Sequence, residues 1–339
     1  MQLYEHGSKY YDKKIKYDLS ENINPLGMPP SVKKVIANCP EAFSKYPDSE
    51  YLVLRESIAL HMGVDISNVC LGNGADELIW KIMQVFKPER ILELAPTFSE
   101  YARSATAIHA VVDDYLLEAD NDFVIGEDFL KKMDRGYDMV FLCNPNNPTG
   151  KVIPRKQLEG IARKALEVNS IVVIDESFLD FTDEISMASC INEFENLIII
   201  RGFTKIYGMA GIRLGYMIGS PKHTLRIKEY GPLWNVSSVA MLAGQAALDE
   251  DNWIEQTKRY ISNEKEYIYR NIPDAIKSDA NFILIKTSES MADRLYENGI
   301  AVRKCENFSG LDYTYIRVGI KSHECNKAFV DAYKEITNG

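Results

Sequence analysis

The chain has 339 residues, of which 46 % are apolar and 26 % charged, proportions typical of a globular protein. This length suits one large domain with a smaller companion rather than a single minimal core. The formal net charge of −10 argues against general binding to nucleic acid or to an anionic membrane. An anionic substrate would therefore need a local cluster of arginines.

No stretch approaches the ~20 consecutive apolar residues of a membrane span, so we expect none. The segment from Met1 to Ser20 has no apolar core, so we expect no signal peptide. The six cysteines lie far apart without a C-x-x-C pair, which predicts reduced thiols in a cytoplasmic protein. The five histidines do not cluster with them, so no metal site is predicted.

Between residues 69 and 218, short apolar runs alternate with amphipathic segments. The runs predict buried strands at Val69–Leu71, Ile91–Leu94, Met139–Cys143, Ile171–Ile174, Leu197–Ile200 and Leu214–Ile218. The segments Glu77–Phe86 and Gln157–Val168 have helical spacing, and Pro154 suits a first helical turn. Buried strands separated by helices predict a mostly parallel sheet covered on both faces. Such sheets bind ligands at the carboxyl ends of their strands.

The chain changes character after residue 231. The predicted elements there are Ser237–Leu248, a long helix Trp253–Arg270, strands Phe282–Ile285 and Tyr315–Ile320, and a closing helix Cys325–Ile336. We therefore predict a large domain over residues 25–230. A small α/β domain would be formed by residues 231–339 together with an N-terminal arm, 1–24.

The segment Thr204–Tyr216 follows the strand Leu197–Ile200 and places Lys205 at the mouth of the sheet. Three glycines in this segment allow tight backbone turns. A lysine with a lowered pKa could form a Schiff base with an aldehyde cofactor there. The alternative is an ordinary exposed lysine.

Asp175 follows the buried run Ile171–Ile174, where a carboxylate needs a cationic or hydrogen-bonding partner. A protonated pyridine nitrogen would supply one. The alternative role for Asp175 is a helix N-cap. The turn Asn144–Gly150 ends another strand, and its two prolines and glycine could present asparagine side chains outward or serve only as structure.

The loop Gly72–Glu77 joins a predicted strand to a predicted helix. Glycines at a helix start leave backbone N–H groups directed at an anion. The loop lacks the Gly-Lys-Ser/Thr ending of a Walker loop, and by itself it is weak evidence.

The order of phosphate loop, turn asparagine, Asp175, Lys205 and Arg213 resembles the fold-type-I pyridoxal-phosphate (PLP) enzymes. Over nearly its whole length the chain resembles the class I/II aminotransferase family. The resemblance implies an α/β fold of the PLP-dependent transferase (aspartate aminotransferase-like) type, with a mostly parallel central sheet, helices on both faces and a smaller subdomain. It also implies pyridoxal 5'-phosphate as cofactor and a small-molecule substrate.

By this resemblance, Lys205 would hold the cofactor and carry a proton, and Asp175 would bind the ring nitrogen. Asn147 would bind the 3-oxygen of the ring, and Phe98 would stack on the ring unless it is only a core residue. The positions that match the surroundings of the cofactor phosphate are Gly74, Ala75, Asp76, Thr204 and Arg213. Tyr46 resembles the tyrosine that reaches this phosphate from a neighbouring subunit, which implies a homodimer. Arg317 would clamp the substrate carboxylate.

Several segments resemble the threonine-phosphate decarboxylase branch more than the histidinol-phosphate aminotransferase branch. They are His6-Gly7, residues 19–27, Pro232–Ser237 and Val302–Leu311. In that branch Arg303 and His6 would hold the substrate phosphate, and Asn24 would line the site. The alternatives are a residue of an unstructured terminus for His6 and an exposed strand-end charge for Arg303.

Three positions depart from these patterns. Gly202 lacks a hydroxyl expected near the cofactor phosphate, Phe178 replaces a tyrosine of the aminotransferase branch, and Ser8 replaces a glycine. We expect decarboxylation of a small phosphorylated amino acid, with transamination of the histidinol-phosphate type as the alternative. A PLP-fold binding protein without catalysis is disfavoured because both Lys205 and Asp175 are present.

Overall fold

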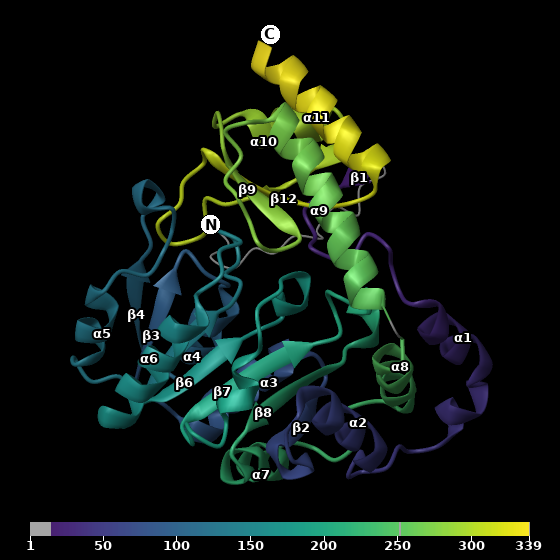
Figure 1. The fold of residues 1–339 in the computed structure, drawn as a ribbon, viewed down its shortest axis with the longest axis vertical. Helices are drawn as coiled ribbons and strands as arrows, with labels where there is room; N and C mark the ends of the chain where they lie inside the picture. Colours follow the sequence, from purple (N-terminus) through teal and green to yellow (C-terminus); the bar gives the residue numbers. More distant parts are fainter. Residues whose placement is uncertain (1–14, 251, 339) are drawn as a thin grey trace.

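The computed structural model describes residues 15–250 and 252–338, and a seven-stranded sheet forms its centre (Figure 1). The strand order is β2-β8-β7-β6-β5-β3-β4. The strands are β2 (Val69–Gly72), β3 (Arg90–Ala95), β4 (Val111–Leu116), β5 (Met139–Cys143), β6 (Ile171–Asp175), β7 (Leu197–Gly202) and β8 (Gly215–Gly219). Only β8 runs opposite to its neighbours in this sheet, which confirms the prediction of a mostly parallel sheet.

Helices cover both faces of this sheet because its central strands are apolar on both sides. In β5, Phe141 packs towards α3 and α4, and Val140 packs towards α6. One face is covered by α3 (Ala75–Phe86), α4 (Glu100–Ala107) and α7 (Pro221–Tyr230); the other carries α2 (Leu52–Met62), α5 (Asp128–Met133), α6 (Arg155–Glu167) and α8 (Ser238–Leu248). The edge strand β4 was not predicted, since its two aspartates and its exposed Val111 and Leu116 break the apolar pattern.

A smaller unit stands above the large sheet in Figure 1. Its three-stranded antiparallel sheet has the order β11 (Arg303–Lys304), β12 (Tyr315–Gly319), β9 (Phe282–Lys286), and α10 (Met291–Glu297) and α11 (His323–Asn338) lie beside it. The long helix α9 (Trp253–Asn271) runs from one unit to the other. The strand β1 (Tyr17–Asp18) pairs with β10 (Ile300–Ala301), so the N-terminal segment joins the small unit.

The helix α8 packs against α1 (Pro30–Asn38) and α2, on the side of the large unit, although the predicted boundary assigns it to the small domain. Short 3-10 helices occupy Pro40–Ser44, Ile66–Asn68, Ala119–Asn121, Leu179–Phe181, Met187–Cys190 and Ala210–Ile212. In the described part of the chain no helix is both long and apolar enough to span a bilayer.

Candidate active site

A cavity of about 450 Å³ lies at the carboxyl ends of β5, β6 and β7. The large unit forms one wall of the cavity, and the small unit with the segment Ser20–Ile23 forms the other. The predicted site residues along its walls are Ala75, Asp76, Phe98, Asn147, Asp175, Thr204, Lys205, Arg213, Arg303 and Arg317. The chain therefore brings together residues that lie up to 242 positions apart, from Ala75 to Arg317.

Lys205 lies three residues beyond the end of β7. Its carbonyl oxygen accepts the N–H groups of Asn24, at 3.1 Å, and of Gly208, at 3.3 Å, which fixes the backbone of the loop. Burial lowers the pKa of the Lys205 ammonium to about 8, assisted by the positive charge of Arg317. A substantial fraction of this amine is therefore neutral near physiological pH, and the neutral form is the nucleophile. The alternative of an exposed lysine is wrong, because this side chain lies in the cavity.

Asp175 is the last residue of β6 and is 4 % exposed. One carboxylate oxygen accepts the Tyr101 hydroxyl at 2.8 Å, and the other accepts the Ser177 N–H at 2.9 Å. Burial raises the pKa of this carboxyl against the effect of these hydrogen bonds. A cation on the cavity side would favour its ionised form. Asp175 does not cap a helix, because the next one begins at Leu179 and its N-cap is Phe178.

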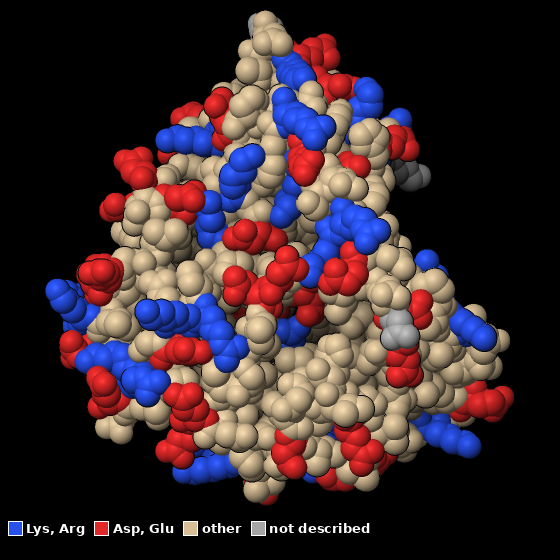
Figure 2. Space-filling view, in the orientation of Figure 1, with Lys and Arg blue, Asp and Glu red and all other residues tan. Residues whose placement is uncertain are grey.

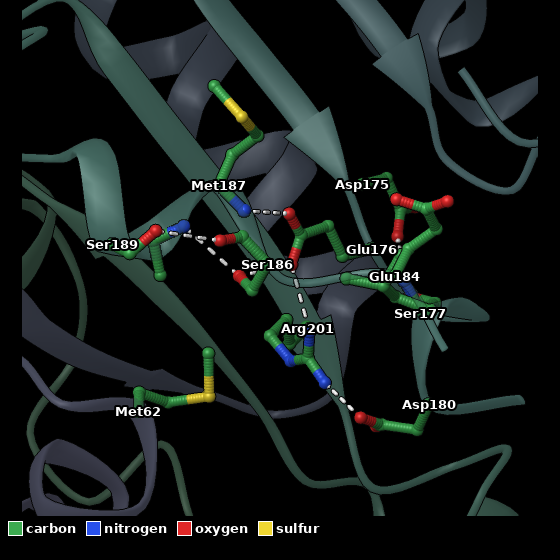
Figure 3. A network of polar contacts seen from close by, with 12 residues as sticks. Met62, Asp175, Glu176, Ser177, Asp180, Glu184, Ser186, Met187, Ser189 and Arg201 are labelled. Atoms are coloured by element: carbon green, nitrogen blue, oxygen red, sulfur yellow. Dashed lines mark hydrogen bonds and ion pairs between the residues drawn. The ribbon is translucent and has the colours of Figure 1, made fainter. Parts of the chain in front are cut away.

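A buried ion-pair network lies behind Asp175 (Figure 3). The Arg201 guanidinium, at the end of β7, pairs with Glu176 at 2.8 Å and with Asp180. Glu176 also accepts hydrogen bonds from the Ser186 hydroxyl, at 2.6 Å, and from the Met187 N–H, at 2.9 Å. This network ties the loop after β6 to β7, and so fixes Asp175 and Lys205 relative to each other.

The corner beside α3 has the features of a phosphate site. Gly74 has a φ of +85°, and a Cβ at this position would overlap the Arg213 guanidinium. The N-terminus of α3 has no side-chain cap among the described residues, and the start of a helix directs backbone N–H groups at an anion. Thr204 and Arg213 line the same corner, and Arg213 donates to the Ala210 carbonyl at 3.2 Å.

Only one asparagine of the turn Asn144–Gly150 lines the cavity. Asn144 accepts the Ile153 N–H at 2.8 Å, and Asn146 bonds to Thr97 and to the Pro96 carbonyl. Both side chains therefore serve the turn itself. Asn147 lines the cavity, where its Oδ1 accepts a hydrogen bond from Arg317 at 2.5 Å.

Arg303 and Arg317 are register partners on the antiparallel strands β11 and β12, and both are buried. Arg317 donates to the Ser20 carbonyl at 2.8 Å as well as to Asn147, while its buried Nε has no partner among the described residues. Burial and the neighbouring charge of Arg303 lower the pKa of Arg317 to about 10. Arg303 donates to Asn307 at 2.7 Å, and its burial rules out an exposed strand-end charge. Two buried like charges favour an anion between them.

The chain is similar to known proteins both in sequence and in fold. Residues 14–332 match the family model for aminotransferase class I and II. The chain belongs to this family. It is 31 % identical to the threonine-phosphate decarboxylase of Salmonella typhimurium over 95 % of this chain and 91 % of that protein. It is 32 % identical to the histidinol-phosphate aminotransferase of Ruminiclostridium cellulolyticum over 94 % of this chain and 91 % of that protein. The crystal structure of the histidinol-phosphate aminotransferase from Clostridium acetobutylicum has a TM-score of 0.89 at 32 % identity, covering 95 % of this chain and 99 % of that one.

These matches confirm the predicted family and the aspartate aminotransferase-like fold. Members of the aminotransferase class I and II family use pyridoxal 5'-phosphate, and the residues along the cavity fit this cofactor. The Lys205 amine could hold its aldehyde carbon, Asp175 could hold its ring nitrogen, and the uncapped start of α3 with Arg213 could hold its phosphate. Phe98 lines the cavity beside Tyr101, with a ring separation of 5.6 Å.

Two predicted side chains in the described part of the chain lie elsewhere. Asn24 is not among the residues that line the cavity, because its amide donates to the Ile206 carbonyl, at 2.6 Å, and to Thr257, at 2.8 Å. It supports the backbone beside Lys205 instead. Tyr46 lies at the surface, 79 % exposed, and His6 and Ser8 lie outside the described residues.

The sequence did not single out Tyr101 or the cavity-lining Glu21 and Asn22. Tyr101 lies in the first turn of α4, three residues after Phe98, and this spacing could have predicted that the two rings are neighbours. No such signal exists for Glu21 and Asn22, because their position depends on the pairing of β1 with β10 at the other end of the chain.

Proposed function

We propose that this protein is a PLP-dependent enzyme that decarboxylates a small phosphorylated amino acid of the threonine-phosphate kind. The observation that carries the proposal is the pair of buried guanidinium groups of Arg303 and Arg317 in the cavity that contains Lys205. O-Phosphothreonine has two anionic groups on a short carbon skeleton, and two adjacent arginines complement both. The similarity to the Salmonella typhimurium decarboxylase supports this choice.

The surface charge is consistent with recognition inside the cavity. Figure 2 shows Asp and Glu side chains gathered across the middle of one face, while an area below them around β8 carries few charges. An anionic substrate therefore finds its positive partners in the buried arginines rather than on this face.

Each residue has a defined task in this proposal. Pyridoxal phosphate, when bound, supplies an electron sink for the bond that breaks at the substrate Cα. Arg317, whose Nε has no partner within the described part of the chain, would hold the substrate carboxylate, and Arg303 would hold the phosphate. Together they would fix the orientation of the substrate Cα, and decarboxylation requires that the bond to the carboxylate be the one placed to break. The Lys205 amine, whose pKa burial lowers to about 8, would transfer the proton at the substrate Cα.

Transamination of a histidinol-phosphate-like substrate is the second candidate. It is supported by the likeness to the Ruminiclostridium cellulolyticum and Clostridium acetobutylicum aminotransferases. Histidinol phosphate has no carboxylate, so Arg303 would bind its phosphate. Arg317 would then bind the carboxylate of the amino-group acceptor.

Product analysis distinguishes these reactions. The PLP-loaded protein is incubated with O-phosphothreonine alone, or with histidinol phosphate and 2-oxoglutarate. Carbon dioxide release from the first supports decarboxylation, and glutamate formation in the second supports transamination. If no phosphorylated amino compound changes the cofactor absorbance, the protein is a PLP-fold binding protein and the proposal is wrong.

We further propose a homodimer in which Tyr46 of each chain approaches the cofactor phosphate of the other. Tyr46 is exposed, and the neighbouring stretch of sequence contains further exposed apolar residues, namely Phe43, Leu52, Val53 and Leu60. An exposed apolar surface of this kind is typical of a subunit interface. The cytoplasm is the proposed compartment, since all six cysteines are unpaired.

A further inference from the structure

Glu77, in the first turn of α3, connects two segments with different tasks in the proposed enzyme. Its Oε2 accepts the backbone N–H of Asn73 at 2.6 Å and the side-chain amide of Asn235 at 2.9 Å. Asn73 lies in the loop where the cofactor phosphate would bind. Asn235 lies at the end of the surface segment Gly231–Asn235. A single carboxylate oxygen thus bridges the phosphate corner and the surface segment.

The other oxygen of Glu77 holds the opposite end of this segment. Its Oε1 pairs with the Lys81 ammonium at 3.1 Å. Lys81 is buried and packs so closely on Gly231 that a Cβ there would overlap its side chain. A buried ammonium needs such a carboxylate partner. Both Gly231 and Asn235 are therefore positioned through Glu77.

Trp234 lies between these two anchors and faces the surface. Its φ of +59° is uncommon for a bulky residue, so the anchors must hold it in place. Its ring stacks on that of Tyr46 with 4.4 Å between the centroids. Trp234 is 42 % exposed and Tyr46 79 %, so the stacked pair forms part of the exposed apolar surface. Asn235 is held further by the Tyr51 hydroxyl at 3.2 Å.

We propose that Glu77 is a positioning residue that couples anion binding at the phosphate corner to association of two chains through Tyr46 and Trp234. This inference rests on the proposed function. An anion bound by the loop fixes Asn73, which fixes the Glu77 carboxylate and, through Asn235, the stacked aromatic pair. The coupling is reciprocal, so association tightens cofactor binding by the same factor.

Subunit exchange between two populations with different fluorophores tests this coupling. In the wild-type protein, PLP is expected to slow exchange by about 5- to 150-fold, the usual range for coupled sites. In Glu77→Ala and in Asn235→Ala, PLP should slow exchange by a smaller factor than in the wild-type protein, since the bridge is lost and only the direct approach of Tyr46 to the phosphate remains. The double variant should behave like either single variant, because both remove the same link. Glu77→Gln keeps one acceptor oxygen and should show an intermediate ratio, which also serves if Glu77→Ala does not fold.

The matched control is Glu159→Gln in α6. It removes an ion pair with Arg155 that has the same four-residue spacing but contacts neither the phosphate loop nor the segment Gly231–Asn235. This control should keep the wild-type ratio. The inference would be overturned if PLP slowed exchange by the wild-type factor in the Glu77 and Asn235 variants, or if PLP did not slow exchange of the wild-type protein. Failure of the proposed function looks different, since the PLP-loaded wild-type protein would then release no carbon dioxide from O-phosphothreonine, whatever the exchange ratios.

Discussion

The wall of the cavity that the large unit forms, the cofactor wall, differs in construction from the wall that the small unit and Ser20–Ile23 form, the substrate wall. On the cofactor wall, Asp175 ends β6, Lys205 follows β7, and the phosphate corner lies between β2 and α3. Each of these residues lies at the end of a strand of one sheet or within three residues of it. On the substrate wall, Arg317 reaches a carbonyl 297 residues away in the chain, at Ser20. In the proposed function, the chemistry would thus be fixed by local connections, and the substrate selection by long-range pairing.

The two walls also differ in charge. The cofactor wall combines the opposite charges of Asp175 and Lys205, whereas the substrate wall presents the like charges of Arg303 and Arg317. A change on the cofactor wall should therefore affect every substrate. A change on the substrate wall should affect substrates according to the anions they carry.

Lys205→Ala is the change with the largest expected effect. Loss of proton transfer alone should lower kcat by on the order of 10²- to 10⁴-fold for all substrates. Borohydride reduction followed by peptide mass spectrometry should find no PLP adduct at the cavity. Lys265→Met is a matched control, because Lys265 is another lysine whose pKa burial lowers to about 8, but it does not line the cavity. An adduct at the normal site in Lys205→Ala would contradict the assignment.

Arg303→Met tests the selectivity of the substrate wall. A hydrogen bond to a charged group contributes about 1.5–3 kcal/mol, so kcat/KM for O-phosphothreonine should fall by about 10- to 150-fold. Threonine, which lacks the phosphate, should lose much less. The corresponding change Arg317→Met should lower both, since both substrates have the carboxylate. Equal losses for the two substrates in Arg303→Met would remove Arg303 from phosphate recognition.

The sequence predicts the cofactor wall well because position along the chain and position in space coincide there. A residue at the end of a buried parallel strand lies at the ligand-binding edge whatever the rest of the chain does. Lys205, Asp175 and the glycine loop before α3 were all placed by this rule.

The substrate wall could not be predicted in the same way. Arg303 lies in a two-residue strand, too short for any periodic pattern, and its pairing with Arg317 is set by the surrounding small unit. Asn24 shows the same limit, since the sequence motif does not reveal that its amide faces Ile206 and Thr257.

The pH dependence of Lys205 connects the two walls. PLP reacts with the neutral amine, so its rate of attachment to the apoprotein should rise as the pH passes through about 8 and level off above it. The positive charge of Arg317 helps to lower this pKa. Arg317→Met should therefore move the midpoint to higher pH, as stopped-flow absorbance can measure. Arg303→Met is the control and should leave it in place. A midpoint that stays constant or falls in Arg317→Met would contradict the coupling.

Gly202→Ser should increase the affinity for PLP by a small factor. A Cβ at Gly202 would lie 3.7 Å from the Leu214 carbonyl oxygen and 3.8 Å from the Ala75 Cβ, which is ordinary contact. The added hydroxyl would reach the phosphate corner, where one hydrogen bond contributes about 0.5–1.5 kcal/mol. PLP should then bind about 2- to 12-fold more tightly.

This effect is best measured by fluorescence titration in the Lys205→Ala background, where binding is not covalent. Gly202→Ala is the control, because it fills the same space without a hydroxyl. A serine variant no tighter than the alanine variant would place the phosphate away from Gly202. Neither change should affect the substrate wall. In protein that retains Lys205, the ratio of the kcat/KM values for O-phosphothreonine and threonine should therefore stay constant.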